Sequence, residues 1–263
     1  MTTILDKIVA DKKTEVARIK RQVPIWSLRE HAKHRKPRDL AAALRGGGAS
    51  LTDRIKLIAE VKKASPSKGL LCPDYQPVEL ARTYTNNGAA AISVLTESKY
   101  FKGNLEHLEE IRKTVNIPLL RKDFIFDDYQ VYESAAFGAD AILLITAILE
   151  QKRLEELLLL CKELSLNALV EIHNEAELKK AKLAGAEIIG INNRNLNTFE
   201  VNTDTTRQLR ALIPPSCIVV SESGISSKDD IKKMKECKVN AVLVGEALVT
   251  AKDIPTKMRE LLS

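Results

Sequence analysis

Eight short apolar runs recur between residues 57 and 245, and this repetition limits the possible folds more than any other feature. Each run is rich in Ile, Leu, Val and Ala and is too short for a helix, which is typical of a strand buried on both faces. We therefore predict eight strands, at Leu57–Val61, Ala90–Leu95, Pro118–Lys122, Ala141–Thr146, Ala168–Ile172, Ile188–Asn192, Ile218–Glu222 and Ala241–Gly245.

Helical patterns separate these runs, as in Lys152–Leu164 and Glu175–Ala184. Gly-Ala precedes several of the runs, which suits a helix C-cap that turns into the next strand. Strands that alternate with helices form a parallel sheet, and eight such units in about 200 residues predict an α/β fold of the (β/α)8 TIM-barrel type. An open doubly wound sheet is the competing fold, but Ser65–Gly69 is not the glycine-rich loop that usually follows its first strand.

The first 45 residues differ from the rest, because apolar positions from Ile4 to Ile19 recur at near-helical spacing. Gly46–Gly48 then interrupt the helical pattern. We predict a helical extension over residues 1–48, packed on a catalytic barrel formed by residues 49–263, with both parts in one structural domain.

The composition limits the class of protein and its partners. The 263 residues are 44% hydrophobic but only 4% aromatic, which favours an α/β protein over an all-β one. The formal net charge of +6 is either ordinary solubility charge or an attraction for an anionic ligand. The basic stretch Arg29–Arg38 has no interleaved aromatic residues, so we expect no nucleic-acid partner.

The four cysteines lie too far apart in the sequence for a metal-ligand or redox motif, and we expect reduced thiols in a cytoplasmic protein. The segment Met1–Lys20 is charged throughout and lacks the apolar region of a signal peptide. No uncharged apolar run approaches the roughly 20 residues of a membrane span. We therefore expect neither a metal site nor a membrane partner.

Polar side chains stand at the carboxyl ends of the predicted strands, where barrel enzymes place their active sites. Glu60 and Lys62 share the face of Ile58 on the first strand, and Lys122 ends the third. Burying a carboxylate beside an ammonium is costly and is rarely selected for stability alone. The later strands contribute Glu171, Asn192, Arg194, Glu222 and Glu246. We expect two lysines and three carboxylates of this set to shift one another's pKa values and to divide into acid and base roles.

Each of these residues also has a structural interpretation. A lysine at a strand end can extend to solvent, a glutamate can cap the next helix, and Asn192 can stabilise a turn. We expect His173 to be a hydrogen-bonding loop residue and not a catalyst, because no nucleophile or metal ligand stands near it in the sequence.

Two turns of small residues, Ser223–Ser226 and Gly245–Leu248, follow the last two strands and lead into helices. Backbone N–H groups at helix starts bind phosphate, and barrels often place phosphate after these two strands. We expect Ser65 and Lys68 of the first loop to complete an anion site. Ordinary strand-to-helix turns are the alternative.

Taken in order, these segments resemble the indole-3-glycerol-phosphate synthase family over nearly the whole chain. One match would carry little weight, whereas five in the same order and spacing are specific. Asn104 stands where we expect serine at least as often, which leaves the detail of that loop open. The matching segments are Glu60–Lys63 with Ser65–Gly69, Leu120–Phe124, Glu171–His173, Gly190–Arg194 and Ser221–Ile225, and the start Ile4–Ile8 with Lys12–Val16 is similar to the family's extra helical segment.

The resemblance implies a carboxy-lyase of tryptophan biosynthesis that acts on 1-(2-carboxyphenylamino)-1-deoxyribulose 5-phosphate. The reaction closes an indole ring with loss of carbon dioxide and water, and it uses no cofactor and no metal. This agrees with an anion anchor beside acid and base groups, and it accounts for the absence of a nucleophile motif from the sequence.

The resemblance also implies a role for each matching residue. Lys122 is the general acid for ring closure, and Lys62 holds the substrate carboxylate and shares the acid role in dehydration. Glu171 transfers a proton in the second stage, while Glu60 orients Lys62 and removes the final proton. Further implied contacts are Asn192 and Glu222, which orient the substrate, Arg194 near the amino-aryl group, Phe101 and Phe124 at the anthranilate ring, and Ser65, Ser223, Gly224, Gly245 and Glu246 at the phosphate.

Two other functions remain open at this point. A sugar-phosphate aldolase of the same fold would form a Schiff base on Lys122, which borohydride would trap. A non-catalytic anion-binding protein would bind polynucleotide in a strongly salt-dependent way and would not need Lys122. We expect a monomer, since no long apolar helix face demands a partner.

Overall fold

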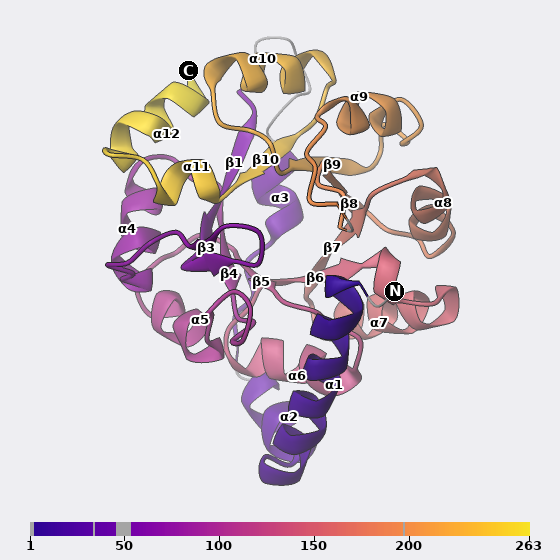
Figure 1. Ribbon diagram of the computed structural model, residues 1–263. Helices are drawn as coiled ribbons and strands as arrows, with labels where there is room; N and C mark the ends of the chain where they lie inside the picture. Colours follow the sequence, from indigo (N-terminus) through magenta and orange to yellow (C-terminus); the bar gives the residue numbers. More distant parts are fainter. Residues whose placement is uncertain (1–2, 34, 46–53, 197) are drawn as a thin grey trace.

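The computed structural model describes residues 3–33, 35–45, 54–196 and 198–263 and contains a closed barrel of eight parallel strands (Figure 1). β1 pairs with both β4 and β10, which closes the barrel. All eight predicted strands are confirmed, with each end within one residue of its expected place. The strands are β1 (Lys56–Val61), β4 (Ala91–Leu95), β5 (Leu119–Lys122), β6 (Ala141–Ile145), β7 (Asn167–Ile172), β8 (Ile188–Asn192), β9 (Ile218–Glu222) and β10 (Ala241–Val244).

Helices surround the barrel, and their apolar faces pack against the outward side chains of the strands, such as Leu57, Ile92 and Ile142. This arrangement confirms the predicted (β/α)8 fold. A single 3-10 turn at Thr146–Ile148 follows β6 within the described residues. The surrounding helices are α4 (Pro77–Asn86), α5 (Leu105–Arg112), α6 (Asp128–Ala136), α7 (Gln151–Glu163), α8 (Glu175–Leu183), α9 (Asp204–Arg210), α10 (Lys228–Glu236), α11 (Glu246–Val249) and α12 (Ile254–Leu262).

The predicted helical extension consists of α1 (Ile4–Gln22), α2 (Ile25–Lys33) and α3 (Leu40–Arg45). In Figure 1, α1 lies in front of the barrel and α3 behind it, so the extension reaches both ends of the barrel. The helix between them in the sequence, α2, packs against α6. The expected break at Gly46–Gly48, and with it the boundary at residue 48, lies outside the described residues.

α3 closes the amino-terminal end of the barrel. Its Leu40 and Leu44 are fully buried in the same apolar cluster as Ile58 and Leu120 of the barrel interior. The N–H of Leu40 donates to Asn167 Oδ1 at 2.7 Å, at the first residue of β7. Apolar side chains thus fill this end, and the polar strand ends lie at the opposite one.

A buried ion pair fixes α1 to the barrel. Lys12 is only 3% exposed, and its Nζ lies 3.2 Å from Asp123 Oδ1 and 2.9 Å from Glu15 Oε2. Burial favours the protonated form of Asp123, but Lys12 and Arg121 outweigh it and lower the pKa of this carboxyl. Asp123 follows Lys122 directly, so the anchor of α1 adjoins the polar end of the barrel.

We predict that Lys12→Met lowers the free energy of unfolding by roughly 3 kcal/mol, because it removes one partner of a buried charge pair. Urea denaturation monitored by circular dichroism measures this difference. Lys7→Met in the same helix is the control, because Lys7 is exposed and its replacement should cost less than about 0.5 kcal/mol. Equal losses in the two variants would contradict the anchoring role.

Candidate active site

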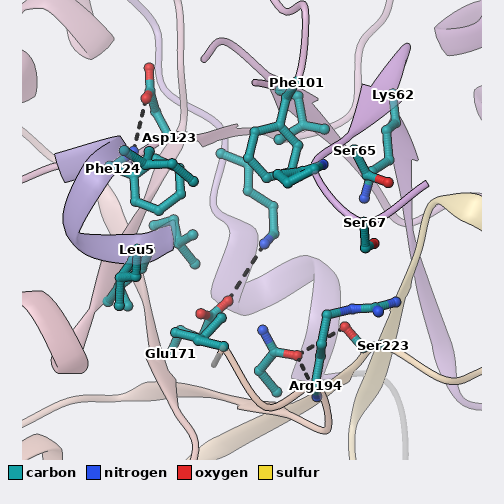
Figure 2. A pocket seen from close by; sticks show the side chains of 18 of the residues that line it. Leu5, Lys62, Ser65, Ser67, Phe101, Asp123, Phe124, Glu171, Arg194 and Ser223 are labelled. Carbon is teal, nitrogen blue, oxygen red and sulfur yellow. Dashed lines mark hydrogen bonds and ion pairs between the residues drawn. The ribbon is translucent and has the colours of Figure 1, made fainter. Parts of the chain in front are cut away.

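The carboxyl ends of the strands bring two lysines and three glutamates together. Lys122 Nζ lies 3.4 Å from Glu222 Oε2 and 3.5 Å from Glu171 Oε2, and Lys62 Nζ lies 3.1 Å from Glu60 Oε1. All three carboxylates are buried. Figure 2 shows the side chains of Lys62 and Glu171 on opposite sides of one cavity.

Two glycines provide the space for these carboxylates. A Cβ on Gly190 would lie 2.2 Å from Glu222 Oε1, and a Cβ on Gly245 would lie 2.5 Å from Glu60 Oε1. Neither glycine has the positive φ that glycine alone adopts easily. Space, and not backbone conformation, therefore requires glycine at both positions.

The buried charges divide the titratable groups into different protonation states. Burial opposes the charge of Lys122, but Glu222, Glu171 and Glu60 outweigh it and raise the pKa of this amine. Burial raises the pKa of Glu222 to about 7, against the attraction of Lys122. Burial also opposes the charge of Glu171, yet Lys122 and His173 lower its pKa to about 2. One site thus holds an ammonium, a carboxylate and a carboxyl group that titrates near neutral pH, as acid–base catalysis requires.

His173 forms a hydrogen bond, as predicted, but its main partners were not foreseen. Its Nε2 lies 3.4 Å from Glu171 Oε1 and its Nδ1 lies 2.9 Å from Glu177 Oε2. The signal in the sequence is the spacing: residues 171 and 173 share a strand face, and residue 177 lies one helical turn further on.

Two aromatic rings line the apolar part of the cavity. The ring centroids of Phe101 and Phe124 are 6.2 Å apart, and Lys62 Nζ lies 5.7 Å from the centroid of Phe101. The buried carboxylate of Glu97 holds the loop that carries Phe101, since it accepts hydrogen bonds from the backbone N–H groups of residues 99–101 at 2.7 to 3.0 Å. Glu97 was not among the predicted site residues, although an acidic residue just after a strand is a signal in the sequence.

The first turns of α1 complete this apolar part. Ile4, Leu5 and Ile8 line the same cavity of about 140 Å³, and Figure 2 shows Leu5 beside Phe124. We predicted that residues 1–48 pack on the barrel, but not that their first helix lines the site. Asn104, whose loop was left open, caps α5 by accepting a hydrogen bond from the N–H of Glu106.

A second, more polar cavity of about 590 Å³ adjoins the first. The turns Ser223–Ser226 and Gly245–Ala247 line it, together with Lys68. Ser223 and Gly224 have φ values of 66° and 78°, a left-handed backbone that is unusual for serine. Asn192 Oδ1 accepts hydrogen bonds from Ser223 Oγ at 2.9 Å and from the N–H of Arg194 at 3.0 Å. Asn192 therefore does stabilise these turns, which was its structural interpretation.

The first loop bridges the mouth of this second cavity. It forms a short antiparallel hairpin of β2 (Ala64–Ser65) and β3 (Gly69–Leu70), which the sequence analysis did not predict. Lys68 of this hairpin forms an ion pair with the carboxylate of Glu246. Glu246 was expected at the phosphate through its backbone, and its side chain also faces the cavity. All fourteen predicted site residues line one of the two cavities.

In residues 3–33, 35–45, 54–196 and 198–263, no group of three or more His, Cys, Asp and Glu side chains is placed to hold a metal ion. Over the same part of the chain, no helix combines the length and the apolar character that crossing a membrane requires.

The fold and the site define an enzyme of the TIM-barrel class in which acid and base groups gather at the carboxyl ends of the strands. The family model described as "Indole-3-glycerol phosphate synthase" matches residues 5–261. The chain belongs to the indole-3-glycerol phosphate synthase family, as the resemblance of its motifs indicated.

Curated relatives carry the same name. The chain is 51% identical over 264 residues to "Indole-3-glycerol phosphate synthase" of Dehalococcoides mccartyi, with 98% of this chain and 100% of the relative covered. It is 50% identical to the protein of that name from Roseiflexus sp. (strain RS-1), with 99% and 98% covered. The Polaromonas naphthalenivorans protein is 45% identical, with 99% of both chains covered.

Solved structures support the fold. A crystal structure of KGPDC from Streptococcus mutans superposes with a TM-score of 0.63 at 14% identity, covering 79% of this chain and 95% of that one. 3-Hexulose-6-phosphate synthase gives a TM-score of 0.60 at 13% identity, covering 79% and 98%. At such low identity these similarities concern the barrel alone.

The opposite pKa shifts of the buried carboxyl groups of Glu222 and Asp123 predict opposite effects of pH on stability. Because the pKa of Glu222 is raised to about 7, its contribution to the free energy of unfolding is complete below pH 4.5 and is lost as the pH rises through 7. Glu222→Gln does not titrate at this position, so it should gain roughly 1 to 3 kcal/mol over wild type between pH 4.5 and 8. Chemical denaturation at a series of pH values measures this change.

Asp123→Asn is the matched control. Lys12 and Arg121 lower the pKa of the Asp123 carboxyl, so its contribution to stability is complete above about pH 4, and neither partner titrates near neutral pH. The difference in stability between this variant and wild type should stay constant from pH 5 to 8. A constant difference for Glu222→Gln as well would contradict the raised pKa of Glu222.

Proposed function

We propose that this chain is an indole-3-glycerol phosphate synthase of tryptophan biosynthesis. It converts 1-(2-carboxyphenylamino)-1-deoxyribulose 5-phosphate into indole-3-glycerol phosphate, carbon dioxide and water. The observation that carries the proposal is the position of Lys122, which stands among three buried carboxylates between an aromatic cavity and a polar one.

The two cavities suggest how the substrate lies. The anthranilate ring packs against Phe101 and Phe124, which both line the apolar cavity, and its carboxylate then comes within reach of Lys62 above Phe101. The phosphate fits the polar cavity, against the backbone of Ser223–Ser226 and Gly245–Ala247, with Lys68 as the nearby cation. The sugar chain then crosses Lys122, and Ser65 and Arg194 lie along its path.

Ring closure begins when the ring carbon that bears the carboxylate attacks the ketone. Negative charge develops on the ketone oxygen, and the Lys122 ammonium stabilises it and donates a proton as that oxygen becomes basic. Carbon dioxide then leaves and restores the aromatic ring. The three carboxylates keep Lys122 protonated beforehand, which is the state an acid needs.

Dehydration needs an acid for the leaving hydroxyl group and a base for the final proton. Lys62 shares the acid role, and Glu60 holds its amine at 3.1 Å. The substrate loses one proton in this stage. Glu60 stands next to the same cavity as the base that removes it, and Glu171, which Lys122 and His173 keep ionised, accepts this proton in turn. Asn192 and Glu222 orient the substrate. No step draws on a cofactor.

We further propose that the protein is a cytoplasmic monomer with residues 1–48 as its extension. The four cysteines are free thiols, which suits a reducing compartment. The exposed large apolar side chains of the described residues come singly from different elements and form no continuous helix face.

We predict that the purified protein, in metal-free buffer with chelator, produces indole absorbance and fluorescence from the carboxyphenylamino-deoxyribulose phosphate. This assay tests the reaction, the substrate and the independence from a cofactor together. No product from folded protein would contradict the proposal. Covalent trapping by borohydride in the presence of substrate would favour the aldolase instead.

We predict that Gly224→Ala raises KM at least tenfold and changes kcat much less, because it disturbs the phosphate contact and not the acid–base groups. A Cβ at this position would meet Val201 at 2.5 Å, and φ is +78°. Gly185→Ala is the matched control, with a φ of +79° and nothing within 4 Å of the added Cβ. It should lower stability without changing KM; equal KM values in the two variants would contradict the assignment.

A further inference from the structure

His173 and Glu177 form a hydrogen-bonded pair next to Glu171, on the side away from Lys122. Glu177 Oε2 accepts hydrogen bonds from the backbone N–H of His173 and from its Nδ1, both at 2.9 Å. Asn174 Nδ2 donates to the other oxygen, Glu177 Oε1, at 2.9 Å. The carboxylate of Glu177 therefore fixes both the orientation of the imidazole ring and the proton on Nδ1.

The other ring nitrogen then faces the catalytic glutamate. With Nδ1 engaged by Glu177, the Nε2 of His173 points to Glu171 Oε1 at 3.4 Å. Lys122 lies 3.5 Å from Glu171 Oε2. Glu171 is thus held by one cation at each carboxylate oxygen, and this leaves it little freedom to turn.

The charges around His173 favour its protonated form. Glu171 of β7 and Glu177 of α8 face the ring directly. The neighbouring 3-10 turn contributes the neutral hydroxyl of Thr146, at 2.9 Å from Glu177 Oε2. Lys122 of β5 contacts Glu171 on the oxygen away from the ring. The ammonium of Lys180 in α8 donates hydrogen bonds to the backbone carbonyl groups of Thr146 and Leu149.

We propose that His173 is a positioning residue for Glu171, held in place by Glu177: as an imidazolium it keeps the Glu171 carboxylate ionised and aligned with Lys122. The inference rests on the proposed function, in which Glu171 must be ionised to accept a proton. The charges around the ring support it, because burial disfavours the charge of His173 but Glu171 and Glu177 raise its pKa to about 10. At neutral pH the ring is charged.

The structural consequence of losing His173 is specific. Glu171 would keep Lys122 but lose the cation at Oε1, so its pKa would rise toward the ordinary range and its carboxylate would turn more freely. Substrate contacts would remain, since His173 lies outside both cavities. The loss should therefore appear in kcat and its pH dependence, and not in KM.

The test is the pH profile of kcat for His173→Asn against wild type, with indole formation as the readout. We expect kcat at pH 7 to fall roughly tenfold to a hundredfold, as when the partner that orients a functional ligand is removed. KM should stay within about twofold, and the acidic limb of the profile should move to higher pH by about one unit. Glu177→Gln should shift the limb in the same direction by less.

His107→Asn is the matched control, because His107 is another partly buried histidine, packed against Tyr75 away from Glu171. Its kcat and pH profile should equal those of wild type. An active His173→Asn enzyme with an unshifted acidic limb, or a shift of equal size in His107→Asn, would overturn the inference.

A measurement on wild type does not depend on the variants or on turnover. Nitrogen-15 NMR of the histidine rings should show both nitrogens of His173 protonated at pH 7. A neutral ring at pH 7 would overturn the inference even if the variant were inactive. Absence of indole product from wild type would instead defeat the proposed function while the ring titration still stood.

Discussion

The ammonium of Lys122 among the carboxylates of Glu60, Glu171 and Glu222 is the interaction on which the rest of the site depends. Three buried carboxylates cannot all ionise beside one another without a cation, and Lys122 is shared between Glu171 and Glu222. Burial raises the pKa of Glu222, and the negative charges of Glu171 and Glu60 add to this effect against the attraction of Lys122. Such a cluster costs stability compared with an apolar core, so its place in the barrel points to chemistry.

The fold provides for this cluster in several places. Gly190 and Gly245 leave the space that Glu222 and Glu60 occupy, and α3 fills the opposite end of the barrel with leucine. The end of β5 contributes to both faces of the sheet. Lys122 points into the mouth of the barrel, while Asp123, one residue later, forms an ion pair with Lys12 of α1. The helix that lines the apolar cavity is thereby fixed one residue away from the central lysine.

The sequence was enough to predict the strands and the rim residues, because each depends on a local pattern. A run of apolar residues sets a strand, the strand end sets the side of the barrel, and alternation sets the direction of the side chain. The resemblance of five ordered motifs then added the reaction.

What the sequence could not supply depends on contacts between distant or differently oriented segments. The pairing of Lys12 with Asp123 joins residues far apart in the chain, and the grip of Glu97 on the loop of Phe101 depends on the path of that loop. The β2–β3 hairpin is too short for a periodic pattern. The spacing of His173 from Glu171 and Glu177 was visible in the sequence. A single histidine has many structural roles, however, so only the geometry connects it to Glu171.

The central claim is that the ammonium of Lys122 acts as the acid for ring closure. The most direct measurement is the rate of indole formation by Lys122→Arg, which keeps a positive charge among the carboxylates but holds its proton far more tightly. The account predicts a fold stability close to wild type and a rate reduced by about a thousandfold. A rate above a tenth of wild type would show that a positive charge alone is enough and would contradict the account.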